Sequence, residues 1–257
     1  MISIVQLGTV DYATGLRLQQ QLVSLRKEEK IGDVLLLLEH SPVITLGRNA
    51  KAANVVASPE FLKQRGVELF ECDRGGDVTF HGPGQLVGYP IFDLRGFAAS
   101  DGKRKTLGVI EFVRRLEDVL MRTCADFGIS TKRVAGLTGV WTDPSEAKLA
   151  AIGVHISRSV TSHGFALNVN TDLSYFNLIV PCGITTKPVT SMQKELGRIL
   201  DLNAVAESIS RNFGVVFQSQ ILWVETLDAL LGRTVGVPMQ APAELRRLHG
   251  EDEIVNA

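Results

Sequence analysis

Hydrophobic positions along the chain form short apolar runs and helically spaced series in turn, which predicts a protein of mixed strands and helices. Residues 2–7 have the pattern of a first strand, residues 34–39 are an apolar run of strand length, and a proline separates this run from another short strand at 43–46. Between the first two runs, Asp11 is a typical helix-capping residue, and leucines at helical spacing predict a helix that reaches about Lys30. The chain therefore begins with strands that flank one helix.

The rest of the pattern predicts more strands around one long amphipathic helix. That helix is expected over about 107–127, and Ser58 followed by Pro59 marks an earlier helix start. Thr190 begins a predicted capping box, short helices follow up to Phe213, and residues 215–224 have the pattern of a strand. Further strands are expected at 68–71, 78–80, 86–92, 133–135, 140–142, 149–156 and 164–169.

The order of these elements indicates the fold class. Strands cluster with turns between them and helices are few, which is not the alternation of a doubly wound parallel sheet. We therefore expect an α+β fold with a mixed, largely antiparallel sheet and helices packed on it. Residues 1–215 are expected to form the main domain, and residues 216–257 an appendage packed on it whose tail, 251–257, is frayed.

Composition narrows the class of protein. The net charge of −1 gives no general attraction to nucleic acid or to anionic membranes, and 45% hydrophobic residues suffice for a core. Cys72, Cys124 and Cys182 have no C-x-x-C spacing, which argues against a disulfide framework and a zinc finger. The longest apolar run, 34–38, is too short to cross a bilayer, and the start of the chain lacks a signal-peptide pattern. A soluble cytoplasmic protein is expected.

One cysteine stands in a setting that favours chemistry. Cys182 lies between Pro181 and Gly183, which predicts a turn, whereas an isolated cysteine is more often a small buried hydrophobic residue. Lys148 begins a mostly apolar strand, and alone it would be taken as a solvated strand-end lysine. If the fold brings Lys148 to Cys182, the thiol pKa falls and a nucleophilic thiolate exists at neutral pH.

A longer motif adds a family resemblance. The segment from Arg74 to Pro90, with Arg74-Gly75-Gly76 and His81-Gly82-Pro83-Gly84-Gln85 inside it, resembles the signature of the lipoyl(octanoyl) transferases. The resemblance covers roughly residues 1–215. Other matching blocks lie at 42–48, 139–141, 151–154, 163–168 and 181–183, together with Lys148.

The resemblance implies a fold, a reaction and a set of site residues. The fold would be the biotin/lipoate protein ligase-like α+β fold, and Cys182 would carry an acyl thioester, with Lys148 lowering its pKa. The octanoyl group would pass from octanoyl-acyl carrier protein to a lysine of a lipoyl domain, in 2-oxoacid dehydrogenase complexes or the glycine cleavage H protein, as the first step of protein lipoylation. No metal, dissociable cofactor, nucleic acid or membrane is implied. The substrate-binding residues would be Arg74, Gly75, Gly76, Asp77, Val78, Thr79, Phe80, His81, Ala151, Ile152, Gly153, Gly164, Phe165 and Ala166.

Several alternatives stay open at this level. Gly82-Pro83-Gly84 lacks the third glycine and the following helix of a dinucleotide-binding loop. His81 could line the substrate site or cap a turn. A slot for the octanoyl tail could be walled by Val78, Phe80, Leu137, Phe165 and Leu167.

Two other functions compete with octanoyl transfer. An ATP-dependent lipoate–protein ligase of the same fold would not need a cysteine at position 182, and a non-catalytic carrier-protein scaffold would need neither reactive residue. A basic cluster is interpreted as a solvated face, with docking of an acidic carrier as the sharper alternative. Its members are Lys103, Arg104, Lys105, Arg114, Arg115, Lys132 and Arg133.

Overall fold

A large mixed sheet organises the molecule. The computed structural model describes residues 1–99, 106–183 and 187–232. Within this part the sheet has eight strands, and its first two neighbour pairs are parallel while the other five are antiparallel. This confirms the predicted α+β class. The strand order is β11 (Ile221–Trp223), β1 (Ile2–Val10), β2 (Asp33–His40), β6 (Gln85–Ile91), β10 (Val160–Asn168), β9 (Lys148–Ser157), β8 (Leu137–Thr142) and β7 (Thr131–Val134).

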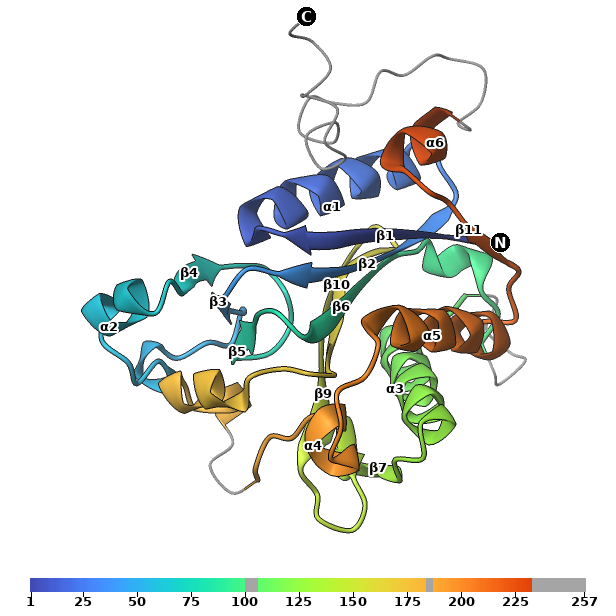
Figure 1. The fold of residues 1–257 in the computed structure, drawn as a ribbon. Helices are drawn as coiled ribbons and strands as arrows, with labels where there is room; N and C mark the ends of the chain where they lie inside the picture. The colour runs from blue at the N-terminus through green and yellow to red at the C-terminus, as the bar shows by residue number, and fades with distance from the viewer. Residues whose placement is uncertain (100–105, 184–186, 233–257) are drawn as a thin grey trace, which may run out of the picture.

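A second, smaller sheet stands beside the large one (Figure 1). It contains β4 (Glu68–Glu71), β3 (Val43–Leu46) and β5 (Val78–His81), in that order. Helix α2 (Pro59–Gln64) begins at the predicted Ser58 cap, whose hydroxyl accepts from the Phe61 amide. Four short 3-10 segments also lie in the described chain: Ala52–Asn54, Leu94–Gly96, Leu173–Leu178 and Pro181–Gly183.

Helices cover both faces of the large sheet (Figure 1). α1 (Tyr12–Lys27) and α6 (Leu227–Gly232) pack on one face, and α3 (Val109–Asp126) and α5 (Leu202–Val216) pack on the other. Strand β2 shows why its sequence is a continuous apolar run. Leu35 and Leu37 point into the core with α3 and α5, whereas Leu36 belongs to the core under α1. A short α4 (Met192–Leu196) precedes α5.

Two local predictions are wrong. The strand expected over 215–224 is present only at Ile221–Trp223, because α5 continues to Val216 and a turn follows it. Phe213 and Phe217 are one helical turn apart and stack at 5.4 Å between ring centroids in the core, so packing outweighs the strand preference of the intervening valines. Thr190 is not a cap either: its amide donates to the Lys148 carbonyl, and Ser191 caps α4 instead.

The last described elements are continuous with the rest of the fold. Strand β11 pairs with β1 at an edge of the large sheet, and the Val224 amide donates to Ile4 O at 2.9 Å. Leu227 and Leu231 of α6 are buried in the core cluster under α1. Among the described helices none is long and apolar enough to cross a membrane.

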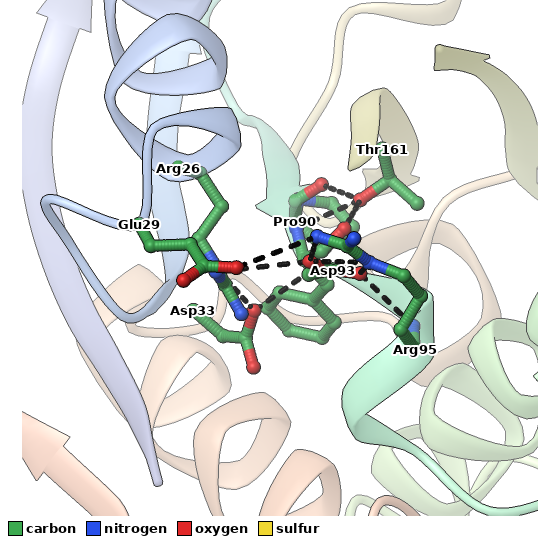
Figure 2. Close-up of polar contacts among 8 residues, drawn as sticks. Arg26, Glu29, Asp33, Pro90, Asp93, Arg95 and Thr161 are labelled. Atoms are coloured by element: carbon green, nitrogen blue, oxygen red, sulfur yellow. Dashed lines mark hydrogen bonds and ion pairs between the residues drawn. The ribbon is translucent and has the colours of Figure 1, made fainter. Parts of the chain in front are cut away.

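A polar network ties together the ends of α1, β2 and β6 (Figure 2). Asp33 accepts from the Arg26 guanidinium at 2.9 Å and from the Asp93 amide at 2.8 Å. The Thr161 hydroxyl of β10 donates to Pro90 O at 2.6 Å and also accepts from the Phe92 amide. These bonds satisfy buried backbone groups where the strands end, and so they fix β6 and β10 in register beside β2.

Candidate active site

A cavity of about 370 Å³ lies between the large sheet and the small one. Its floor is the α1-side face of β6, β10 and β9, and the loop before β5 forms its roof. Lys148 and twelve of the fourteen residues that the resemblance assigns to substrate binding line this cavity. The twelve are Arg74, Gly75, Gly76, Asp77, Thr79, His81, Ala151, Ile152, Gly153, Gly164, Phe165 and Ala166.

The other two assigned residues lie on the opposite side of β5. Val78 and Phe80 are buried in the core of the small sheet, where the Phe80 ring stacks on Tyr175 at 4.6 Å. Successive strand residues point to opposite faces, so Thr79 and His81 face the cavity and their neighbours cannot. Val78 and Phe80 therefore support the cavity wall from behind.

Small residues keep the floor of the cavity open. Ala151 pairs with Ala166 across β9 and β10, and Gly153 pairs with Gly164. A Cβ on Gly153 would lie 2.6 Å from Gly75 O, so the roof loop can rest on β9 only because this residue is glycine. The Gly75 amide donates to Val154 O at 3.0 Å, which holds the loop in that place.

The residues suggested as walls of the octanoyl slot do not all lie on the cavity side of the large sheet. Leu137 lines the cavity, whereas Leu167 belongs to the core with α3 and α5. The Phe165 ring also lies in that core, stacked on Phe213 at 6.1 Å, so it does not wall the slot as a side chain.

Arg74 shapes the roof loop from inside. Its guanidinium donates to the carbonyls of Thr45 and Asp77, both at 2.7 Å, and to Gly75 O at 3.1 Å. The Arg74 side chain thus satisfies backbone carbonyls of the turn it belongs to, rather than pairing with a carboxylate on the surface. A buried guanidinium with five donors in a fixed plane is suited to holding an irregular loop.

Lys148 is held at the start of β9. Its amide donates to Pro188 O and its carbonyl accepts from Thr190 N, so the segment that leads into α4 is anchored to this residue. The side chain is 8% exposed, and Nζ lies 4.7 Å from the centre of the Trp141 ring. The aromatic face favours a cation at this place.

The turn that carries Cys182 lies close to Lys148. Pro181–Gly183 forms a short 3-10 turn, and Pro181 lines a small void together with Lys148 and Thr79. A Cβ on Gly183 would lie 2.9 Å from the Asp77 carboxylate, so the turn also packs against the roof loop. The Cys182 side chain is outside the described part of the structure.

His81 is held in one tautomer by a chain of amides. Asn168 Nδ2 donates to Thr190 O, so its Oδ1 accepts from Gln85 Nε2, whose other hydrogen goes to Phe80 O. Gln85 Oε1 is then left to accept from His81 Nδ1 at 2.7 Å. The pKa of His81 falls to about 3, chiefly because burial disfavours the charged ring and secondly because His40 is near. His81 is therefore neutral, with Nε2 as a hydrogen-bond acceptor.

Other cavity residues were not singled out from the sequence. Tyr89 lines the cavity, and its hydroxyl bonds to His40 Nε2 at 2.6 Å while His40 Nδ1 donates to Val10 O. Tyr12 and His163 line it too. Tyr89 and His163 occur inside matched blocks of the motif, but nothing local marks Tyr12, which reaches the site from the start of α1.

The remaining sequence candidates have ordinary environments. Burial raises the pKa of the Cys124 thiol to about 12, which makes it inert. Cys72 donates to Leu46 O. Arg114, Arg115, Lys132 and Arg133 of the basic cluster each pair with a carboxylate, which favours the solvated-face interpretation, while Lys103, Arg104 and Lys105 lie outside the described residues.

Comparisons with known proteins agree with this architecture. Residues 11–214 match the lipoyl protein ligase A/B catalytic domain. An octanoyltransferase of Koribacter versatilis is 64% identical over 98% of both chains, and one of Acidobacterium capsulatum is 58% identical over 90% of this chain and 96% of that protein.

Solved structures show the same fold at low identity. A lipoate-protein ligase A bound with ATP superposes with a TM-score of 0.67 at 13% identity, covering 98% of this chain and 94% of that one. A putative lipoate protein ligase from T. acidophilum with bound lipoic acid gives 0.66 at 11% identity, covering 97% and 93%. The likeness confirms the predicted mixed sheet with packed helices.

Proposed function

The chain is an octanoyltransferase, an acyltransferase of the lipoyl protein ligase A/B family, and we propose that it carries the octanoyl group on Cys182. The observation that supports this most is the place of Lys148. Lys148 is buried and lines the cavity, and Pro181 of the Cys182 turn lines the small void beside it together with Lys148. A cation there favours a thiolate on the neighbouring cysteine.

The first half-reaction forms the acyl-enzyme. The Cys182 thiolate attacks the thioester carbonyl of octanoyl-acyl carrier protein, and the tetrahedral intermediate expels the pantetheine thiolate, which takes a proton from Lys148. One thioester is exchanged for another, so the step is close to balanced in free energy. The octanoyl tail occupies the cavity above Ala151, Gly153 and Ala166.

The second half-reaction transfers the acyl group to nitrogen. A lysine amine of a lipoyl domain attacks the Cys182 thioester, neutral Lys148 takes the proton that the amine loses, and the C–S bond breaks to release the Cys182 thiolate. The new amide is more stable than the thioester, so transfer proceeds without ATP. We propose lipoyl domains of 2-oxoacid dehydrogenase complexes and the glycine cleavage H protein as acceptors, with the cytoplasm as the place of reaction.

Intact-mass measurement tests the intermediate directly. Incubation with octanoyl-acyl carrier protein should add one octanoyl group to the protein, and Cys182→Ala should abolish both this adduct and transfer to a lipoyl domain. Cys72→Ala is the matched control and should retain both, because Cys72 lies outside the cavity lining. Normal turnover by Cys182→Ala would refute the mechanism. ATP-dependent pyrophosphate exchange would instead support a ligase.

Lys148→Arg separates the two roles of the lysine. Arginine keeps the positive charge but does not deprotonate in a protein. We therefore expect the variant to keep part of its acyl-enzyme formation and to lose more of the aminolysis step, by roughly a hundredfold for lost general-base catalysis. Single-turnover measurements of each half-reaction give the comparison, and equal losses in both would contradict the dual role.

A further inference from the structure

The cavity runs along the β9–β10 pair. Starting from Lys148, its floor passes the pair Ala151 and Ala166, then Gly153 and Gly164, and it ends at His163, whose partner on β9 is Val154. Lys148 and Val154 are six residue steps apart on one strand, roughly 20 Å in an extended chain. The reactive end and His163 are therefore opposite ends of the cavity.

His163 reaches the cavity through an unusual backbone conformation. Phe165 and Leu167 point into the core with α3 and α5, so strict alternation would send residue 163 to that side as well. Instead its φ is +55°, a left-handed conformation that is strained for a non-glycine residue. The imidazole packs edge-on against Tyr89, on the cavity side, at 6.4 Å between ring centroids.

Two bonds hold the strained residue in place. The His163 amide donates to Gln19 Oε1 of α1 at 2.7 Å, and His163 Nε2 donates to Asp73 Oδ1 at 2.7 Å. Asp73 immediately precedes the roof loop, so the carboxylate connects the roof to the floor at this end. The His163 side chain is 3% exposed as a result.

A second cavity of about 320 Å³ lies behind His163. It is bordered by α1 and by polar residues that include Asp73, His155 and Ser157. Among the described residues His163 alone lines both cavities. The imidazole is thus the wall between them.

We propose that His163, tethered by Asp73, is the partition that closes the acyl cavity at its far end and limits the length of the acyl chain. The proposal rests on the proposed function, since it takes the acyl group to extend from Lys148 along β9. A chain that fits ends in front of the imidazole. A longer chain has to displace the ring and break its bond to Asp73.

Replacing the partition should change selectivity for chain length. His163→Gly suits the left-handed backbone and removes the ring. We expect the ratio of kcat/KM for hexadecanoyl- over octanoyl-acyl carrier protein to rise at least about tenfold, the scale of relieving an overpacked contact, because only a chain about as long as the floor meets the imidazole. Asp73→Ala, which only frees the ring, should shift the ratio in the same direction by less.

Control variants separate an effect on chain-length selectivity from an effect on the reaction itself. His155 lies 3.6 Å from the Asp73 carboxylate but lines only the second cavity. The His155→Ala variant should therefore keep the wild-type ratio of kcat/KM for the two donors. His163→Asn, which also tolerates positive φ, replaces His163→Gly if thermal unfolding shows that the glycine variant is not folded. The proposal is refuted if a folded His163 variant has the wild-type ratio of kcat/KM for the two donors, or if the wild type already accepts both donors equally. Failure of the wild type to form an octanoyl adduct would overturn the proposed function instead.

Discussion

At the scale of single residues, the site is built on buried neutral histidines. Burial lowers the pKa of His40 to about 4 and that of His81 to about 3, whereas a histidine in an unfolded chain titrates near 6.5. Below pH 6.5 the unfolded chain therefore binds protons that the folded protein does not, and stability is lost as pH falls. We expect roughly 2 kcal/mol of unfolding free energy to be lost per histidine between pH 7 and pH 5.

Urea unfolding at the two pH values measures this loss. His81→Asn removes one of the two histidines and keeps a donor for Gln85. The loss of unfolding free energy between pH 7 and pH 5 should therefore be about half of the loss that the two histidines cause together in the wild type. Equal pH dependence in variant and wild type would show that His81 takes up its proton alike in the folded and unfolded states.

At the scale of elements, the large sheet depends on polar bonds where its strands end (Figure 2). Asp93 is buried, and hydrogen bonds from Arg95 hold the pKa of its carboxyl below the usual range. Asp93→Asn keeps the shape but weakens the bonds to Arg95 and Arg26. We expect a loss of about 1–2 kcal/mol in unfolding free energy at pH 7.

The pH dependence and a surface control check the cause. A carboxyl with a lowered pKa stabilises the fold above its unfolded pKa, so the difference between wild type and Asp93→Asn should shrink as pH falls through the acidic range. Asp118→Asn, which removes an exposed partner of Arg133, should cost less than about 0.5 kcal/mol. A loss at Asp93 no larger than at Asp118 would contradict this role.

At the scale of the whole molecule, the end of the described chain completes the core under α1. Leu230 of α6 is 6% exposed and belongs to the same cluster as Leu18 and Leu22 of α1. Leu230→Ala should lower the unfolding free energy by about 2–4 kcal/mol through lost burial and the cavity left behind. Ile199→Ala, at a side chain that is 73% exposed, is the control and should change stability little.

A single unfolding transition shifted by Leu230→Ala would mean that α6 and the sheet unfold together. An unaffected main transition would show that the chain after residue 215 behaves as a separate appendage. Circular dichroism and Tyr/Trp fluorescence during urea unfolding distinguish these outcomes, because Trp141 beside Lys148 reports on the site.

Features that a local pattern or a motif specifies could be predicted from the amino-acid sequence. The apolar run of β2, the Ser58 cap and the glycines of the roof loop follow from periodicity and backbone freedom. The motif also named twelve residues that the structure gathers at one cavity with Lys148. These residues come from the segment 74–81 and from the hairpin of β9 and β10 some seventy residues later, and composition alone would not have joined them.

Packing between distant segments sets which side chains face the cavity and which residue closes it. Strand alternation implies that Thr79 and Phe80 differ in direction, but packing against Tyr175 decides which of them is turned away. His163 breaks the alternation through its positive φ, and its partner Asp73 is 90 residues away in the chain. Such a position depends on contacts between distant segments, which no local pattern encodes, and this is why the place of Tyr12 in the site and the pairing of His163 with Asp73 emerged only from the folded molecule.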